Sequence, residues 1–127
     1  MKRFLFLSLF IILLIMLVAC SPKSIDKVII YEMENFSVVK EETAIGLTTK
    51  KEIEVFQNAF SSAVKQSGVV DMVDPNFKVD LGEETYFLWI SEGSGTVMNT
   101  KDTHTIYSLS KKSATEVYET VMINYVN

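Results

Sequence analysis

The 127-residue sequence contains one cysteine, one histidine and two prolines, and the first two shortages limit its chemistry. The lone cysteine, Cys20, has no partner for an internal disulfide. Zinc sites usually need three or four ligands, mostly histidine and cysteine, so a zinc centre is not expected. Positive charge is also scarce, with 12 Lys and Arg against 16 Asp and Glu. Because phosphate contacts need clustered Lys and Arg, the composition argues against nucleic-acid binding.

The N-terminal region contains one long apolar run, from Phe4 to Ala19, interrupted only by Ser8. Lys2 and Arg3 precede it, and this order of basic and apolar residues is typical of a secretory signal peptide. The run has 16 residues, which is fewer than the roughly 20 that a transmembrane helix needs. We therefore expect residues 1–19 to be a signal peptide rather than an uncleaved membrane helix.

The segment Leu17-Val18-Ala19-Cys20 resembles the lipobox of bacterial lipoproteins. The resemblance implies that Cys20 receives a diacylglyceryl group, becomes the first residue after cleavage and anchors the chain on the extracytoplasmic face of the cell membrane. Lipidation would also explain a single unpaired cysteine in an exported chain. Residues 20–24 would then form a short tether that reaches only about 10–12 Å.

Residues 25–127 are long enough for one domain with a hydrophobic core. Alternating and β-branched residues predict strands. A capping-box pattern at Thr49 and Glu52 predicts an amphipathic helix that ends near Ser67-Gly68, and Ser110 can cap a second helix. The expected strands cover residues 26–33, 36–39, 44–48, 77–81, 85–90, 96–99 and 103–109.

Short connections between most of these strands require antiparallel pairing. Each helix has one apolar face, which must be buried against a flat apolar surface. The sequence therefore predicts an α+β fold with two layers, in which a twisted antiparallel sheet carries two amphipathic helices on one face. The opposite face of the sheet is then the place to look for function.

Three stretches of the chain resemble the YhfM-like lipoproteins of Bacillus and its relatives. They are residues 68–75, 84–90 and 94–110, and the last is the most specific. The resemblance extends from about Ile25 to Tyr125 and implies a Gram-positive host and a lipid anchor on Cys20. It implies no catalytic residue and no cofactor.

Asp102 and His104 are the first candidate site. On a strand these two side chains would point to the same face, and they could bind a small ligand or a hard cation such as calcium. The alternative is a hairpin whose polar side chains form local hydrogen bonds. Asn99, Thr103 and Glu92 could lie nearby.

Phe87 and Trp89 are the second candidate site. If the helices cover Tyr86, Leu88 and Ile90, then Phe87 and Trp89 face outward and form an apolar patch that can bind a partner. The alternative is that these aromatic residues belong to the core.

Three functions follow from these features. The first is a non-enzymatic surface lipoprotein that binds an envelope protein or peptide, and the second is a small-ligand or cation-binding module at Asp102 and His104. A hydrolase ranks last, because the sequence lacks the Gly-x-Ser-x-Gly motif that places a serine nucleophile.

Overall fold

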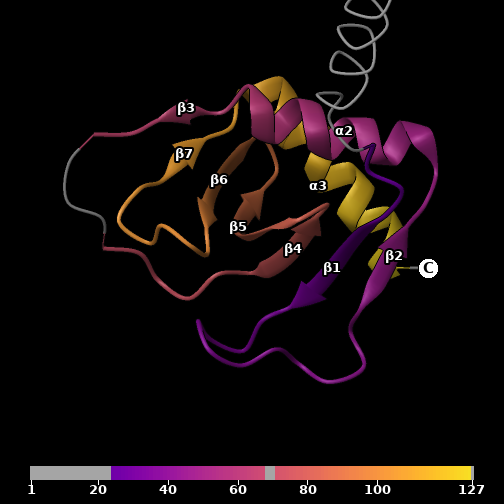
Figure 1. Ribbon diagram of the computed structural model, residues 1–127, viewed down its shortest axis with the longest axis horizontal. Coiled ribbons are helices and arrows are strands. Elements are labelled where there is room, and N and C mark those ends of the chain that lie inside the picture. Colours follow the sequence, from indigo (N-terminus) through magenta and orange to yellow (C-terminus); the bar gives the residue numbers. More distant parts are fainter. Residues whose placement is uncertain (1–23, 68–70, 127) are drawn as a thin grey trace, which may run out of the picture.

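The computed structural model of the chain describes residues 24–67 and 71–126 (Figure 1). The expected signal peptide, Cys20 and most of the tether lie outside the described residues and stay predictions. None of the helices in the described ranges is long and apolar enough to cross a membrane.

The described residues form an antiparallel sheet in which neighbouring strands are hydrogen-bonded in the spatial order β2-β1-β4-β5-β6-β7-β3. The centre of the sheet is a meander, because β4, β5 and β6 follow one another in both sequence and space. The strands are β1 (Val28–Glu32), β2 (Ile45–Leu47), β3 (Val64–Lys65), β4 (Phe77–Leu81), β5 (Glu84–Ser91), β6 (Ser94–Asn99) and β7 (Tyr107–Ser108).

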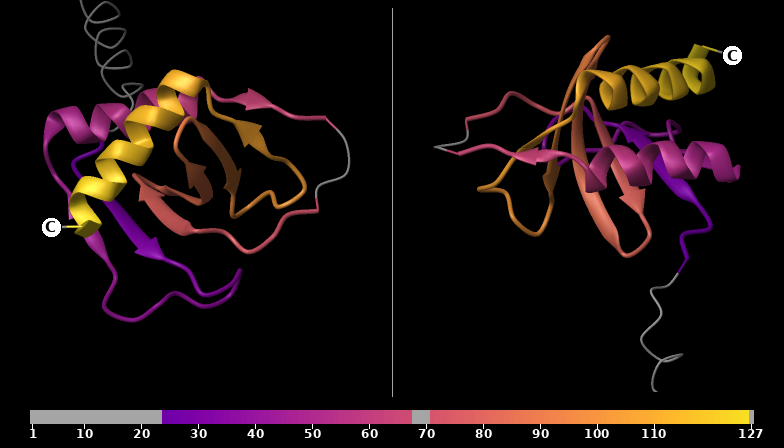
Figure 2. Two further views of the ribbon diagram at one scale, coloured as in Figure 1. Left: turned by 180° about the vertical axis from the view of Figure 1, so that it is seen from behind. Right: turned by 90° about the horizontal axis from the view of Figure 1, so that it is seen from above.

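Two helices, α2 (Lys50–Ser61) and α3 (Lys111–Val126), complete the fold. Seen from behind, α3 crosses in front of the strands and α2 lies beside it (Figure 2). Every second residue of the central strands packs with side chains of both helices in one hydrophobic core. This arrangement confirms the predicted two-layer α+β fold. Its fully buried large side chains are Val28, Ile30, Leu47, Phe56, Val79, Leu88, Val97, Val117 and Val121.

Helix α2 begins as the sequence predicts. The Thr49 side chain accepts a hydrogen bond from the Glu52 backbone N–H at 3.3 Å and donates one to the Glu52 carboxylate at 2.6 Å. The predicted end near Ser67-Gly68 is wrong, because the helix ends at Ser61 and is capped by Ser62. Val64, which the longer predicted helix would include, is 64% exposed in strand β3.

Helix α3 follows the second predicted cap, where the Ser110 hydroxyl accepts a hydrogen bond from the Ser113 N–H at 3.1 Å. Near its C-terminus the Tyr125 hydroxyl donates to the carbonyl of Thr43 at 2.9 Å, and the Ile30 carbonyl lies 3.3 Å away. The Tyr125 ring also lies 5.5 Å from that of Phe77. These contacts fix α3 to β1 and to the loop before β2.

Two predicted strands are largely loops. Residues 36–39 form only an isolated bridge between Met33 and Val39, because the Asn35 side chain accepts hydrogen bonds from the N–H groups of Ser37 and Val38 and makes a turn. The strand expected over residues 103–109 shortens to β7, because the residues before it form a turn.

The glycines around the β5–β6 hairpin have different functions. Gly93 has a φ of +81°, which favours glycine at this turn. Gly95 is buried in β6, and a Cβ there would lie 2.8 Å from the side chains of Ile90 and Leu109. Glycine is therefore favoured at position 93 by its positive φ and at position 95 by the close approach of two core side chains.

Candidate binding site on the open face of the sheet

The face of the sheet that points away from the helices carries a continuous row of four side chains. Backbone pairing places Tyr31 of β1 opposite Lys78 of β4, Lys78 opposite Phe87 of β5, and Phe87 opposite Met98 of β6. Directly paired residues share a face and have neighbouring Cβ atoms. Tyr86, Leu88 and Ile90 join the core on the helix side, which confirms the predicted assignment of the two faces.

A loop residue covers part of this row. Phe36 lies between β1 and β2, and its ring centroid is 5.5 Å from that of Phe87 and 5.9 Å from that of Trp89. The Phe87 and Trp89 centroids are 6.4 Å apart, and the Phe36–Phe87 pair meets edge to face at 89°. Such geometry is a favourable arrangement for aromatic rings. We call Phe36, Phe87 and Trp89 the outer aromatic cluster.

Trp89 is not exposed, so the exposed patch predicted for this residue is wrong and the alternative, that it belongs to a core, holds. Its side chain is only 9% accessible, and its indole Nε1–H donates a hydrogen bond to the carbonyl of Val73 at 2.8 Å. Phe36 packs against it as well, so Trp89 belongs to a small core on the outer face. The surface aromatic residue here is Phe36, which is 37% exposed.

Phe36 is not among the predicted site residues, because the pattern of residues 36–39 predicts a strand. Asn35 is the signal that could have identified it, since asparagine favours turns in which its side chain binds the backbone. That turn places Phe36 over β5, which is two strands away from β1 in the sheet.

A pocket of about 340 Å³ opens beside the outer aromatic cluster, and we call it the Lys78 pocket. Its apolar members come from β5 and from the connection between β1 and β2, which carries Phe36. Among the residues that line it, Lys78 is the one with a charged side chain. The lining residues are Met33, Phe36, Ser37, Val39, Lys78, Thr85, Phe87 and Thr100.

Lys78 is half-buried, and its ammonium lies 5.3 Å from the centre of the Tyr31 ring. Within the described ranges, no carboxylate lies within 4.0 Å of this ammonium. Asp80 is on the same face, two residues along β4, but its carboxylate accepts a hydrogen bond from the Thr85 hydroxyl at 2.9 Å.

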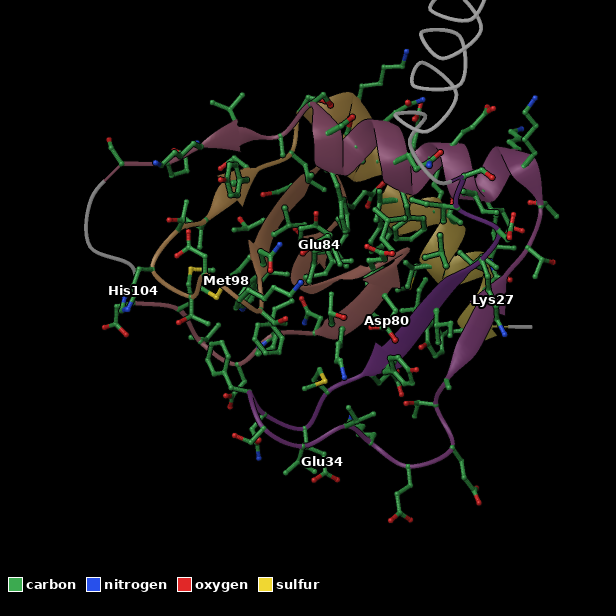
Figure 3. All side chains as sticks on the ribbon, in the orientation of Figure 1. Lys27, Glu34, Asp80, Glu84, Met98 and His104 are labelled. Carbon is green, nitrogen blue, oxygen red and sulfur yellow. The ribbon has the colours of Figure 1, made fainter. Side chains whose placement is uncertain are left out.

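Asp80 also affects the pKa of the Tyr31 hydroxyl. Burial raises the pKa of the Tyr31 hydroxyl, and the negative charge of Asp80 and a hydrogen bond to it raise that pKa further. The Asp80 carboxylate therefore lies close to two neutral hydroxyl groups, those of Thr85 and Tyr31. Figure 3 shows Asp80 near the centre of the sheet, on β4.

Asp102 and His104 lie in the turn before β7, so the strand predicted over residues 103–109 is wrong at His104. Both residues are exposed, and the Asp102 carboxylate accepts a hydrogen bond from the His104 backbone N–H at 3.3 Å. Figure 3 shows His104 at the periphery of the molecule. In the part of the chain that the structure describes, no group of three or more His, Cys, Asp or Glu could hold a metal ion.

Asn99 lies beside this turn, as expected, because its carbonyl accepts a hydrogen bond from the Asp102 N–H at 2.9 Å, but its side-chain amide is directed to Glu84. Its amide donates to the Glu84 carboxylate at 2.8 Å, and Lys101 lies 3.6 Å from the same carboxylate. The hydrogen bond from Asn99 lowers the pKa of Glu84, with a smaller effect from the positive charge of Lys101. This surface cluster stabilises the start of β5 and supplies no ligand to Asp102 or His104.

A second hollow, of about 460 Å³, lies between the two helices. Three glutamates and one lysine surround it, and Ile123, which is 61% exposed, contributes an apolar wall. One side is closed by Asn124, whose amide donates to the Glu52 carboxylate at 3.1 Å. It contains none of the predicted site residues.

The sheet and helices define a two-layer α+β protein with an aromatic pocket on the face that the helices leave open. The model of the YhfM protein family matches residues 21–124, and the chain therefore belongs to the YhfM family. This match confirms that the chain resembles the YhfM family. No curated protein and no solved structure matches the chain.

Proposed function

We propose that this YhfM-family chain is a lipoprotein, anchored through Cys20 to the extracytoplasmic face of a bacterial membrane, whose domain binds a partner without catalysis. The observation that carries the anchor is the segment Leu17-Val18-Ala19-Cys20 after a basic and apolar N-terminal region. The thiol of the only cysteine is the group that a thioether-linked lipid requires.

The open face of the sheet supports the binding part of the proposal. Phe36 and Val38 are exposed by 37% and 44%, and they lie in the loop that borders the Lys78 pocket. Concave sites lined by apolar and aromatic side chains with a few polar groups are the usual form of binding sites. The expected partner is an envelope protein, a peptide or another envelope component.

Acid–base or nucleophilic catalysis would need a suitably placed histidine, and the placement of the histidine favours a non-enzymatic role. His104, the only histidine of the chain, lies in an exposed turn rather than in a pocket. A general base must lie within hydrogen-bond reach of the proton that it removes, usually in a site closed to water. The alternative function, a cation or small-ligand site at Asp102 and His104, rests on only one carboxylate and one imidazole.

The anchor is tested by replacing Cys20 with serine in cells fed radiolabelled palmitate. We expect the wild-type chain to carry the label and to begin at a modified Cys20, whereas Cys20→Ser stays unlabelled and keeps residues 1–19. Ser21→Ala is the matched control and should be labelled and cleaved normally. A wild-type chain with its original N-terminus and no label would contradict the anchor.

The binding face is tested by photo-crosslinking on intact cells. A photoreactive phenylalanine analogue at position 36 should give a defined adduct, because Phe36 lies at the edge of the pocket. The same analogue at position 123, which is exposed between the helices, is the control and should give none. Equal adducts at both positions, or none at position 36, would contradict a binding function of this face.

A further inference from the structure

We propose that the Lys78 pocket binds a small organic anion, with an aromatic or branched aliphatic body and a single carboxylate. This inference rests on the proposed function, since it names the ligand class of the same face. It concerns Lys78, Phe36 and Phe87, which line one pocket although they come from β4, a loop and β5.

The apolar body of such a ligand has a matching surface. Phe87 is the direct cross-strand neighbour of Lys78, so its ring and the lysine stem lie side by side on the open face. Phe36 contributes a second ring, held 5.5 Å from that of Phe87, and Met33 adds a buried, adaptable apolar side chain. A flat or branched apolar group can therefore contact two aromatic rings at once.

The charge of the ligand follows from Lys78. Its ammonium is the one charged group in the lining, and within the described residues it has no carboxylate partner at ion-pair distance. Asp80, the acidic residue closest to it along β4, accepts the Thr85 hydroxyl instead. The ammonium of a half-buried lysine next to aromatic rings favours an anion, since charge-assisted hydrogen bonds are among the strongest available.

The size of the pocket favours a small molecule. About 340 Å³ is near the lower end of the range of roughly 300–1,000 Å³ found for small-molecule sites. Ser37 and Thr100 place hydroxyl groups in the same lining, where they can complete the hydrogen bonds of a carboxylate. A cationic ligand would be repelled by Lys78, and a neutral one would leave its ammonium without a counter-charge.

The test uses the full chain in lipid nanodiscs and two matched probes, 3-phenylpropanoate and its neutral amide. Equilibrium dialysis against empty nanodiscs measures the bound fraction of each probe. We expect the wild-type chain to bind the anion, and Lys78→Gln to weaken this binding by about tenfold or more, since hydrogen bonds to charged groups contribute about 1.5–3 kcal/mol. Lys112→Gln, which removes an exposed lysine outside the pocket, should bind like the wild type.

Two further measurements separate loss of the site from loss of the fold. Lys78→Arg keeps the positive charge and should retain most of the binding, and circular dichroism should be the same for all variants. Trp89 is the only tryptophan and contacts both Phe36 and Phe87, so its fluorescence should change on addition of the anion.

The inference is overturned if the anion does not bind, if Lys78→Gln binds it as well as the wild type, or if the amide binds equally. A crosslinked partner at position 36 together with no anion binding would reject this ligand class and leave the proposed function standing. Absence of palmitate on Cys20 would reject the anchor and leave the ligand result intact.

Discussion

The two faces of the sheet differ in how they exclude water. On the helix side, Val28, Ile30, Val79 and Leu88 are completely buried beneath two helices. On the open side, the row from Tyr31 through Phe87 is half-buried, and a single loop residue, Phe36, lies over its aromatic end. The same strands therefore supply a rigid core on one face and a partly covered surface on the other.

Because of this difference, the stability of the fold and the proposed binding function depend on opposite faces of the sheet. Hydrophobic stabilisation scales with the apolar area removed from water, so most of it comes from the helix side. The open side mixes apolar rings with one lysine, one aspartate and hydroxyl groups, which a stable core does not need. Substitutions on the two faces should therefore have different consequences, and the following four predictions rank them.

The largest effect is expected for Phe56→Ala on the helix side. Phe56 is fully buried between α2 and the sheet, and such a truncation should lower the free energy of unfolding by about 3–5 kcal/mol. Urea denaturation monitored by circular dichroism measures it. Ile123→Ala, on an exposed position of α3, is the control and should change stability by less than about 0.5 kcal/mol. A small loss for Phe56→Ala would remove the distinction between the faces.

Phe36→Ala should have an intermediate effect on the open side. The variant loses two aromatic contacts, but Phe36 is 37% exposed, so we expect a loss of about 1–2 kcal/mol. Trp89 should become more accessible to water, and its emission should shift to longer wavelength. An unchanged emission spectrum would mean that Phe36 does not cover Trp89.

Tyr125→Phe should lower the free energy of unfolding by about 1 kcal/mol, because it removes the hydrogen bond to the Thr43 carbonyl. Burial, with a smaller contribution from the charge of Glu32, raises the pKa of Tyr125 from 10.0 to about 12. The folded state thus favours the neutral hydroxyl, and this stabilisation is complete below pH 10 and disappears as the pH rises through about 12.

Denaturation between pH 9 and 12 should therefore show a smaller loss of stability in Tyr125→Phe than in the wild type. Tyr118→Phe is the control, since the Tyr118 hydroxyl has no hydrogen-bond partner among the described residues. Identical alkaline profiles for wild type and Tyr125→Phe would show that Tyr125 is not the group responsible.

The smallest effect is expected for His104→Ala. His104 is exposed in a turn and contacts Asp102 through its backbone, so stability should change by less than about 0.5 kcal/mol. Calcium and zinc should give no difference in melting temperature between wild type and variant. A metal-dependent rise that disappears in His104→Ala would instead establish the alternative function.

Local patterns in the sequence were sufficient for the fold class. Hairpin signals and alternation identified the central strands, and side chains at Thr49 and Ser110 marked the starts of both helices. The end of α2 was missed because Ala63 and Val64 continue the apolar spacing of the helix, whereas pairing of Val64 with Ser108 of β7 decides the structure. Pairing between segments so far apart in the sequence cannot be predicted from a local pattern of residues.

The candidate site was predictable only in part. Alternation along β5 correctly placed Phe87 and Trp89 on the same face, away from the helices. Burial of Trp89 depends on Val73 and Phe36, which are distant in sequence and reach it through irregular segments. Lys78 is likewise an ordinary alternating residue in the sequence, and only the pairing of β4 with β5 makes it a neighbour of Phe87.

The ends of the sheet have a consequence for molecules packed at high density. The outermost strands are β2, with three residues, and β3, with two. Longer edges expose rows of free backbone groups that can recruit another chain and start aggregation. Edge strands this short offer few free backbone groups for pairing, so many copies at high density can remain separate without pairing their sheets.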